Sequence, residues 1–394
     1  MDKQLNKTKW CAYLQSFCGF QAFFGTVMVI FYTTYMHLTY SQYLMIDSLL
    51  FGMIALFELP SGYLSDKLGR KKMILLARIF EIFAMSILVL IPSFTGAFIS
   101  CIIMGIFAAM ESGNEDALYY EVYSTNGKER EFKAVMGHVS TISLICSTVF
   151  SVISGYVAEV NLAIPVIIDI VLLTISTIGL GFLLHDDESY KQNASFSLTK
   201  DFKNNKEEIL HIVPYFLFFG IIFSLFRVSY SMYQPLLNEL SIPLKYFGYF
   251  FALCNFIGSL GSSLYAKNIF KQKQIPYIIF IFYFITLVGI LLVSNQIGLV
   301  FLLAQQILRG IALPYLRVET QQIIPQGSTL RVTYGSIQSL CSKLTVSIFT
   351  WIYSLVIVSS ISVSMFIMGT IMLGMYIIVY FGIQKREKLI EVKG

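Results

Sequence analysis

The chain has 394 residues, of which 56% are hydrophobic and only 13% are charged, whereas soluble domains carry about 25% charged residues. Its apolar residues form long runs, which argues against a soluble globular fold and predicts an all-α integral membrane protein. The formal net charge is +5. The basic residues fall in loops between apolar runs, so we expect no nucleic-acid partner.

Twelve apolar runs are long enough to cross a bilayer as helices. In chain order we expect them at 10–34, 42–63, 73–92, 96–120, 134–158, 161–184, 210–232, 246–266, 276–294, 298–317, 332–356 and 361–383. Lys and Arg gather in alternate loops, and the opposite loops contain only Lys245. Basic loops stay on the cytoplasmic side. We therefore expect a multi-pass protein of the inner cell membrane, with both termini in the cytoplasm.

The longest polar segment runs from His185 to Glu208 and separates two sets of six predicted helices. We therefore predict an N-terminal six-helix bundle (1–184), a cytoplasmic linker (185–209) and a C-terminal six-helix bundle (210–394). The halves show weak likeness, for example Gly105-Ile106 in the fourth run and Gly310-Ile311 in the tenth. Two six-helix halves are the architecture expected of a rocking carrier.

The loop after the second run contains a motif of ten residues that fits the pattern G-x-L-S-D-x-x-G-R-K. It reads Gly62-Tyr63-Leu64-Ser65-Asp66-Lys67-Leu68-Gly69-Arg70-Lys71. This stretch resembles the loop 2–3 motif of the major facilitator superfamily. Residues 112–121 also look like the S-G-x-x-E-A-L-x-Y-D pattern of some bacterial branches.

The resemblance implies the fold of that superfamily, from an exporter-like bacterial branch, and transport by alternating access. It also implies a gating role for Gly62, Asp66, Gly69 and Arg70, with Asp66 against the N-terminus of the eleventh helix. In physical terms, Gly62 would allow close helix packing and Gly69 would permit the turn.

Two departures weaken the assignment to the drug/proton antiporters of this superfamily. Those proteins usually carry an Arg four residues before a Gly in the fourth helix, where this chain has Cys101 before Gly105. The fifth run also lacks their Gly-Pro pair and reads Ser154-Gly155-Tyr156 instead.

Acidic residues of the fourth run are candidate proton carriers, because ionisable groups inside a membrane are costly. Glu111 and Glu115 lie one helical turn apart, and Asp116 lies beside them. Glu111 is the leading candidate, since a shielded carboxyl group can take up a proton near neutral pH. The alternative is a structural partner for a buried cation. The resemblance places the third and sixth helices at the periphery, so Asp169 and a possible Arg78–Glu81 pair rank lower.

Three cations lie inside predicted helices of the second half, namely Arg227, Arg309 and Lys343. Tyr230 follows Arg227 by three residues, and Gln305 precedes Arg309 by one turn. These side chains predict a site for an anionic or zwitterionic solute. The alternative is a set of internal ion pairs that hold the halves in one state.

The chain has no P-loop for ATP, no His spacing for a metal and no catalytic constellation. We therefore expect no enzyme activity, no cofactor and no metal, and a monomer. The predicted function is proton-coupled export of a small amphipathic anionic or zwitterionic solute, such as a metabolite or siderophore. The alternatives are multidrug efflux of cationic or neutral compounds, and uptake of a small organic solute.

Overall fold

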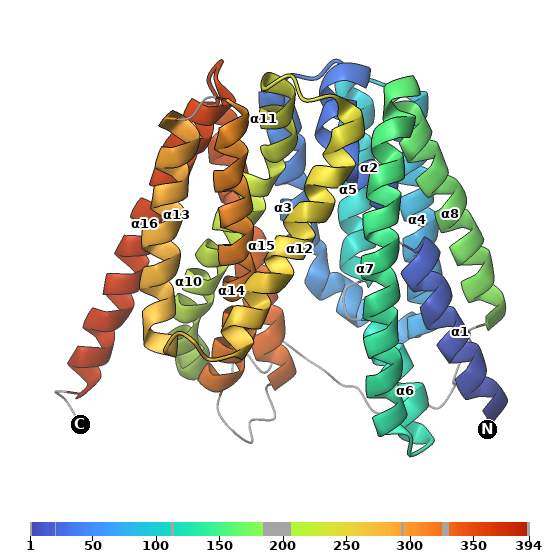
Figure 1. Ribbon diagram of the computed structural model, residues 1–394. Coiled ribbons are helices and arrows are strands. Elements are labelled where there is room, and N and C mark those ends of the chain that lie inside the picture. The colour runs from blue at the N-terminus through green and yellow to red at the C-terminus, as the bar shows by residue number, and fades with distance from the viewer. Residues whose placement is uncertain are drawn as a thin grey trace. The chain divides into compact units, whose positions relative to one another are not determined.

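The computed structural model describes residues 2–19, 21–111, 114–183, 206–292, 295–324 and 331–391. Within these ranges the chain folds into helices and contains no strand (Figure 1). This agrees with the fold class predicted from the apolar runs.

The first half of the chain forms eight α-helices and one π-helical turn, most of which cross the predicted membrane. They are α1 (Asp2–Cys18), α2 (Ala22–Ile30), the π-helix η1 (Phe31–Tyr35), α3 (Tyr40–Leu68), α4 (Arg70–Leu90), α5 (Phe94–Glu111), α6 (Asn114–Thr125), α7 (Glu129–Val160) and α8 (Ala163–Leu183).

The second half forms long helices linked by short helical turns. They are α10 (Lys206–Ser231), α11 (Tyr233–Glu239), η3 (Leu244–Tyr246), α12 (Phe247–Ala266), η4 (Gln272–Gln274), α13 (Ile275–Leu292), η5 (Gln296–Gly298), α14 (Leu299–Ile323), α15 (Arg331–Val356) and α16 (Ile361–Glu391).

Twelve segments of the described chain are long and apolar enough to span a membrane, and each overlaps one predicted run. Two of the predicted runs differ in detail from the structure. The first is broken, because α1 ends at Cys18 and α2 begins at Ala22. The fourth ends earlier than predicted, because α5 stops at Glu111 and α6 starts as a separate helix.

Helix α8 illustrates how a spanning helix divides its faces. Its large side chains Val171, Ile175 and Ile178 are exposed, as expected for a surface that faces lipid. Its opposite face is buried and carries two polar residues, Asp169 and Ser176. The charged residue of this helix and Ser176 therefore point into the protein.

The chain divides into two compact units, and each unit combines segments that are separated in the sequence. Unit 1 contains Met1–Thr39, Gly52–Phe196 and Pro243–Ala252, and unit 2 contains Tyr40–Phe51, Ser197–Ile242 and Leu253–Gly394. The start of α3 thus belongs to unit 2, and the start of α12 belongs to unit 1. The predicted linker at 185–209 lies mostly outside the described residues, so that boundary stays a prediction.

Each unit repeats one contact between its second and fourth spanning helices. In unit 1 the Ser61 hydroxyl donates to the carbonyl of Ala109 at 2.8 Å. In unit 2 the Ser262 hydroxyl donates to the carbonyl of Gly310 at 2.9 Å. Both pairs lie 48 residues apart in the sequence. This equal spacing supports an internal repeat, but it aligns Gly310 with Ala109, which lies one helical turn after Gly105.

Candidate functional site

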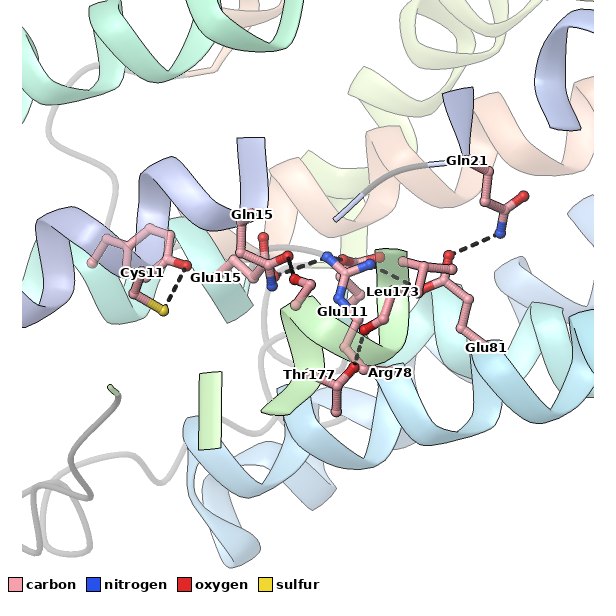
Figure 2. Close-up of polar contacts among 11 residues, drawn as sticks. Cys11, Gln15, Gln21, Arg78, Glu81, Glu111, Glu115, Leu173 and Thr177 are labelled. Carbon is pink, nitrogen blue, oxygen red and sulfur yellow. Dashed lines mark hydrogen bonds and ion pairs between the residues drawn. The ribbon is translucent and has the colours of Figure 1, made fainter. Parts of the chain in front are cut away.

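A buried charged cluster lies inside unit 1, centred on Arg78 of α4 (Figure 2). Its guanidinium nitrogens lie 2.8 Å from a Glu81 oxygen, 2.5 Å from Glu111 and 3.1 Å from Glu115. We call these four residues the Arg78 cluster. The structure thus brings Glu111 and Glu115 together, as predicted, but through a cation from a different helix.

Local structure explains why these side chains meet. Arg78 and Glu81 are three residues apart on the buried face of α4, so they are neighbours on one helix. Glu111 is the last residue of α5 and Glu115 lies in the first turn of α6. The junction between the two helices therefore presents both carboxylates to Arg78. The side chain of Asp116 lies outside the described part of the structure.

The formal charges of the cluster do not balance. One guanidinium faces three carboxylates, and buried charge without a partner is strongly unfavourable. Within the described chain, the Arg78 Nε also has no hydrogen-bond partner. The cluster borders a cavity of about 470 Å³ that also reaches Gln15, Gln21 and Tyr119. Such a group of residues favours uptake of a proton or of a cationic group.

Two glutamines of the broken first helix bind the cluster. Gln15 donates to Glu115 at 2.7 Å, and Gln21 donates to Glu81 at 2.8 Å. Gln15 belongs to α1 and Gln21 directly precedes α2, so the cluster is held from both sides of the break (Figure 2).

In unit 2, Arg227 of α10 is paired internally. Its guanidinium lies 2.9 Å from the buried carboxylate of Asp47 and 4.8 Å from the ring centroid of Phe51. Both partners lie in the first part of α3, which belongs to unit 2. This arrangement matches the alternative of an internal ion pair at this position.

Arg309 lies in a polar network of unit 2. Its guanidinium lies 5.3 Å from the ring centroid of Tyr230 and donates to Gln306 at 3.1 Å. Gln306 donates to the Tyr233 hydroxyl, which in turn donates to Gln305. The structure therefore brings the predicted residues Tyr230, Gln305 and Arg309 together.

Lys343 lies apart from that network and lines a cavity of unit 2. This cavity of about 550 Å³ is lined from α14 and α15 by Arg317, Thr320 and Lys343, with apolar walls from Phe51 and Phe223. The buried Thr320 hydroxyl has no partner in the described part of the chain. Its described lining contains no carboxylate. The cavity is therefore basic and suited to an anionic group.

The loop motif is partly described. Gly69 has φ +88°, a conformation that side chains other than glycine rarely adopt, so this glycine shapes the turn between α3 and α4. No described atom lies within 4 Å of a Cβ placed on Gly62, so the described residues show no close packing there and the role of Gly62 stays a prediction. Arg70 begins α4. The Asp66 side chain lies outside the described part.

Sequence reasoning missed several residues of these sites. The resemblance gives Arg78 a low rank because it places the third helix at the periphery, yet Arg78 is the centre of the unit 1 cluster. An Arg inside an apolar run was the available signal. Asp47 and Arg317 were not singled out, because each lies near the end of a predicted run.

Comparison with known proteins agrees with the fold described above. The sequence matches the Major Facilitator Superfamily over residues 10–350, and no curated protein matches it. The fold is similar to the nucleoside transporter NupG, with a TM-score of 0.72 and 13% identity, over 98% of this chain and 99% of that chain. A substituted form of NupG gives a TM-score of 0.76 and 13% identity, over 97% and 99% of the two chains.

At this identity the structural likeness shows the fold alone. The sequence match, however, extends over most of the chain and agrees with the twelve spanning helices. The chain therefore belongs to the major facilitator superfamily, and it is a multi-pass membrane transporter rather than an enzyme.

Proposed function

We propose that this protein is a proton-coupled transporter that exports a small amphipathic anionic or zwitterionic organic solute by alternating access. The observation that carries the proposal is the charge excess of the Arg78 cluster, in which three carboxylates share one guanidinium. The proposal also includes a monomer in the inner membrane with both termini in the cytoplasm. Its two six-helix halves would be joined by the linker at 185–209.

Glu111 is the preferred proton carrier within this cluster. Its side chain is 27% exposed, compared with 22% for Glu115 and 3% for Glu81. It thus combines contact with Arg78 and access to the cavity. When Glu111 takes up a proton, its ion pair with Arg78 weakens, and Arg78 can bind Glu81 and Glu115 more closely.

The basic cavity around Lys343 and Arg317 is the preferred site for the acidic group of the solute. Arg suits a planar carboxylate or phosphate through paired hydrogen bonds, and Lys adds a point charge. Phe51 and Phe223 supply apolar walls for the rest of an amphipathic molecule. Export is supported by the likeness of residues 112–121 to an exporter-like branch.

Multidrug efflux of organic cations is the second candidate. One observation favours it, namely that the carboxylate excess of the Arg78 cluster would attract a cationic compound into the unit 1 cavity. On that alternative Lys343 and Arg317 are structural.

Transport by purified protein in liposomes tests these alternatives. A pH-sensitive dye inside the vesicles reports proton flux while carboxylate, nucleoside and cationic probes are added in turn. We expect carboxylate probes to drive proton flux, and we expect Glu111→Gln to abolish that flux while solute exchange at equal pH continues. Glu131→Gln is the control, because Glu131 is exposed and pairs with Lys128 outside the cluster.

Two further variants separate the candidates. Lys343→Met and Arg317→Met should each raise the carboxylate concentration for half-maximal transport about tenfold, the effect of roughly 1.4 kcal/mol in binding. If both variants leave proton flux unchanged and only cationic probes drive that flux, export of anions is wrong and cation efflux replaces it.

A further inference from the structure

The first transmembrane helix is interrupted within unit 1, and the interruption is stabilised from outside. Helix α1 ends at Cys18, where the amide of Gly19 donates to the carbonyl of Gln15 at 2.7 Å. Gln21 has φ −81° and ψ 63°, which is not helical, and its side chain does not cap α2. The first amides of α2 therefore need partners from another element.

Asp169 of α8 supplies those partners. Its two carboxylate oxygens accept hydrogen bonds from the amides of Phe24 at 2.7 Å and Phe23 at 3.3 Å. Asp169 is fully buried, with 0% exposure. A carboxylate at the start of a helix also faces the positive end of the helix dipole. Ser154 of α7 adds a bond to the carbonyl of Phe23 at 2.6 Å.

The same face of α8 also holds the other side of the break. Ser176 lies two helical turns after Asp169 and donates to the Gln15 side-chain oxygen at 2.8 Å. The Gln15 amide nitrogen then remains directed at Glu115. Helix α8 thus fixes α1 through Ser176 and α2 through Asp169. Gln15 and Gln21 in turn bind two carboxylates of the Arg78 cluster.

We propose that Asp169 is a positioning residue that holds this break so that Gln15 and Gln21 bind the cluster, and that protonation of the cluster loosens the break. The inference rests on the proposed proton coupling and extends it to a moving part of the protein. An amide-to-carboxylate hydrogen bond weakens when the carboxylate is neutralised. Uptake of a proton should therefore release the start of α2.

Among the described residues, few other titratable groups face the cluster. Cys11 of α1 and Tyr119 of α6 lie 3.7 Å from each other, next to the cluster, and Asp169 lies on α8. The residues of α7 that line the cavity are Met136, Val139 and Ser143, none of which titrates. The pH response is thus assigned to Glu81, Glu111 and Glu115.

Hydrogen–deuterium exchange of the full chain in nanodiscs tests the proposal without any ligand. The peptide over 22–30 reports on the amides that Asp169 binds. In Asp169→Asn we expect about tenfold faster exchange of this peptide, because a hydrogen bond to a charged group is lost. Thr174→Val is the matched control, since the exposed Thr174 bonds only within α8.

The pH response is the second arm. After correction for the chemical pH dependence of exchange, wild-type protein should exchange this peptide faster at pH 5 than at pH 8. Gln15→Ala/Gln21→Ala should remove that difference, because it cuts the links to the cluster while Asp169 stays in place. If Asp169→Asn folds poorly, the pH comparison between wild type and the glutamine double variant tests the proposal by itself.

The proposal is overturned if Asp169→Asn exchanges within twofold of wild type, or if the pH difference persists in the glutamine double variant. Failure of the proposed function has a different signature. In that case wild-type protein moves no protons in liposomes. The exchange experiment still reports separately whether Asp169 holds the start of α2.

Discussion

Arg78 has three carboxylate neighbours, and only Glu81 is close to it in sequence. The other two reach it from the end of α5, at Glu111, and from the first turn of α6, which begins at Asn114. At the scale of single residues, a buried guanidinium is held in place by ion pairs that cost much to break. The same residue thus supports the fold and neutralises part of the negative charge of the three carboxylates.

Removing this guanidinium should destabilise the protein severely. Arg78→Met leaves the buried carboxylate of Glu81 and two half-buried carboxylates without their cation, so we expect a loss of about 3–5 kcal/mol in unfolding free energy. Thermal unfolding in detergent measures the effect. Lys128→Met is the control, because Lys128 and Glu131 form an exposed pair at 3.3 Å whose loss should cost below about 1 kcal/mol. Equal melting of the two variants would contradict this account of Arg78.

At the scale of elements, helix crossings depend on glycines where two backbones meet. A Cβ on Gly310 of α14 would collide with the backbone carbonyl of Gly258 in α12, and a Cβ on Gly261 would collide with that of Ile307. Without side chains at these positions, α12 and α14 approach closely enough for Ser262 to reach Gly310. Small residues at such crossings are typical of membrane helices.

A single methyl group should therefore disturb this crossing. We expect Gly310→Ala to destabilise the protein by about 1–3 kcal/mol through overpacking, measured as a lower melting temperature. Gly374→Ala in α16 is the matched control, because no described atom lies within 4 Å of its added Cβ. Alanine favours a helix over glycine by up to about 1 kcal/mol, so the control should not fall. A melting temperature unchanged by Gly310→Ala would show that the helices separate freely.

At the scale of the whole molecule, the two units share helices. Within unit 2, the hydroxyls of Ser48 in α3 and Ser347 in α15 each donate to the other's backbone carbonyl at 2.8 Å. Asp47 and Arg227 add an ion pair beside them. The first twelve residues of α3 are thus fixed to unit 2, whereas the rest of this helix belongs to unit 1.

A disulfide should test whether transport requires this contact to open. The two serine hydroxyl oxygens lie 3.4 Å apart, which is compatible with a bridge after substitution by cysteine. We expect Ser48→Cys/Ser347→Cys to lose transport on oxidation and to regain it on reduction, as measured by solute uptake into liposomes. The two single cysteine variants are the controls. Full transport by the cross-linked protein would mean that the contact stays closed throughout the cycle.

The sequence predicted the twelve spans well, because long apolar runs leave a membrane helix as the available structure. It did not predict the break after Cys18, since the run contains no proline and the polar and glycine residues there, Gly19 and Gln21, are tolerated inside membrane helices. Arg78 and Asp169 were visible but were ranked low by their place in peripheral helices. The pairing of Arg227 with Asp47 depends on contacts far apart in sequence, which no local pattern encodes.

The shared helices also have a mechanical consequence. Helix α3 passes from unit 2 to unit 1 between Phe51 and Gly52, and α12 passes from unit 1 to unit 2 between Ala252 and Leu253. If one unit rotates, both helices must bend at these positions or lose the contacts of their ends. The energy needed to bend two helices would then add to the free-energy barrier of the rotation. Gly52 stands at one of the two points, and a glycine inside a helix costs about 1 kcal/mol of helix propensity relative to alanine.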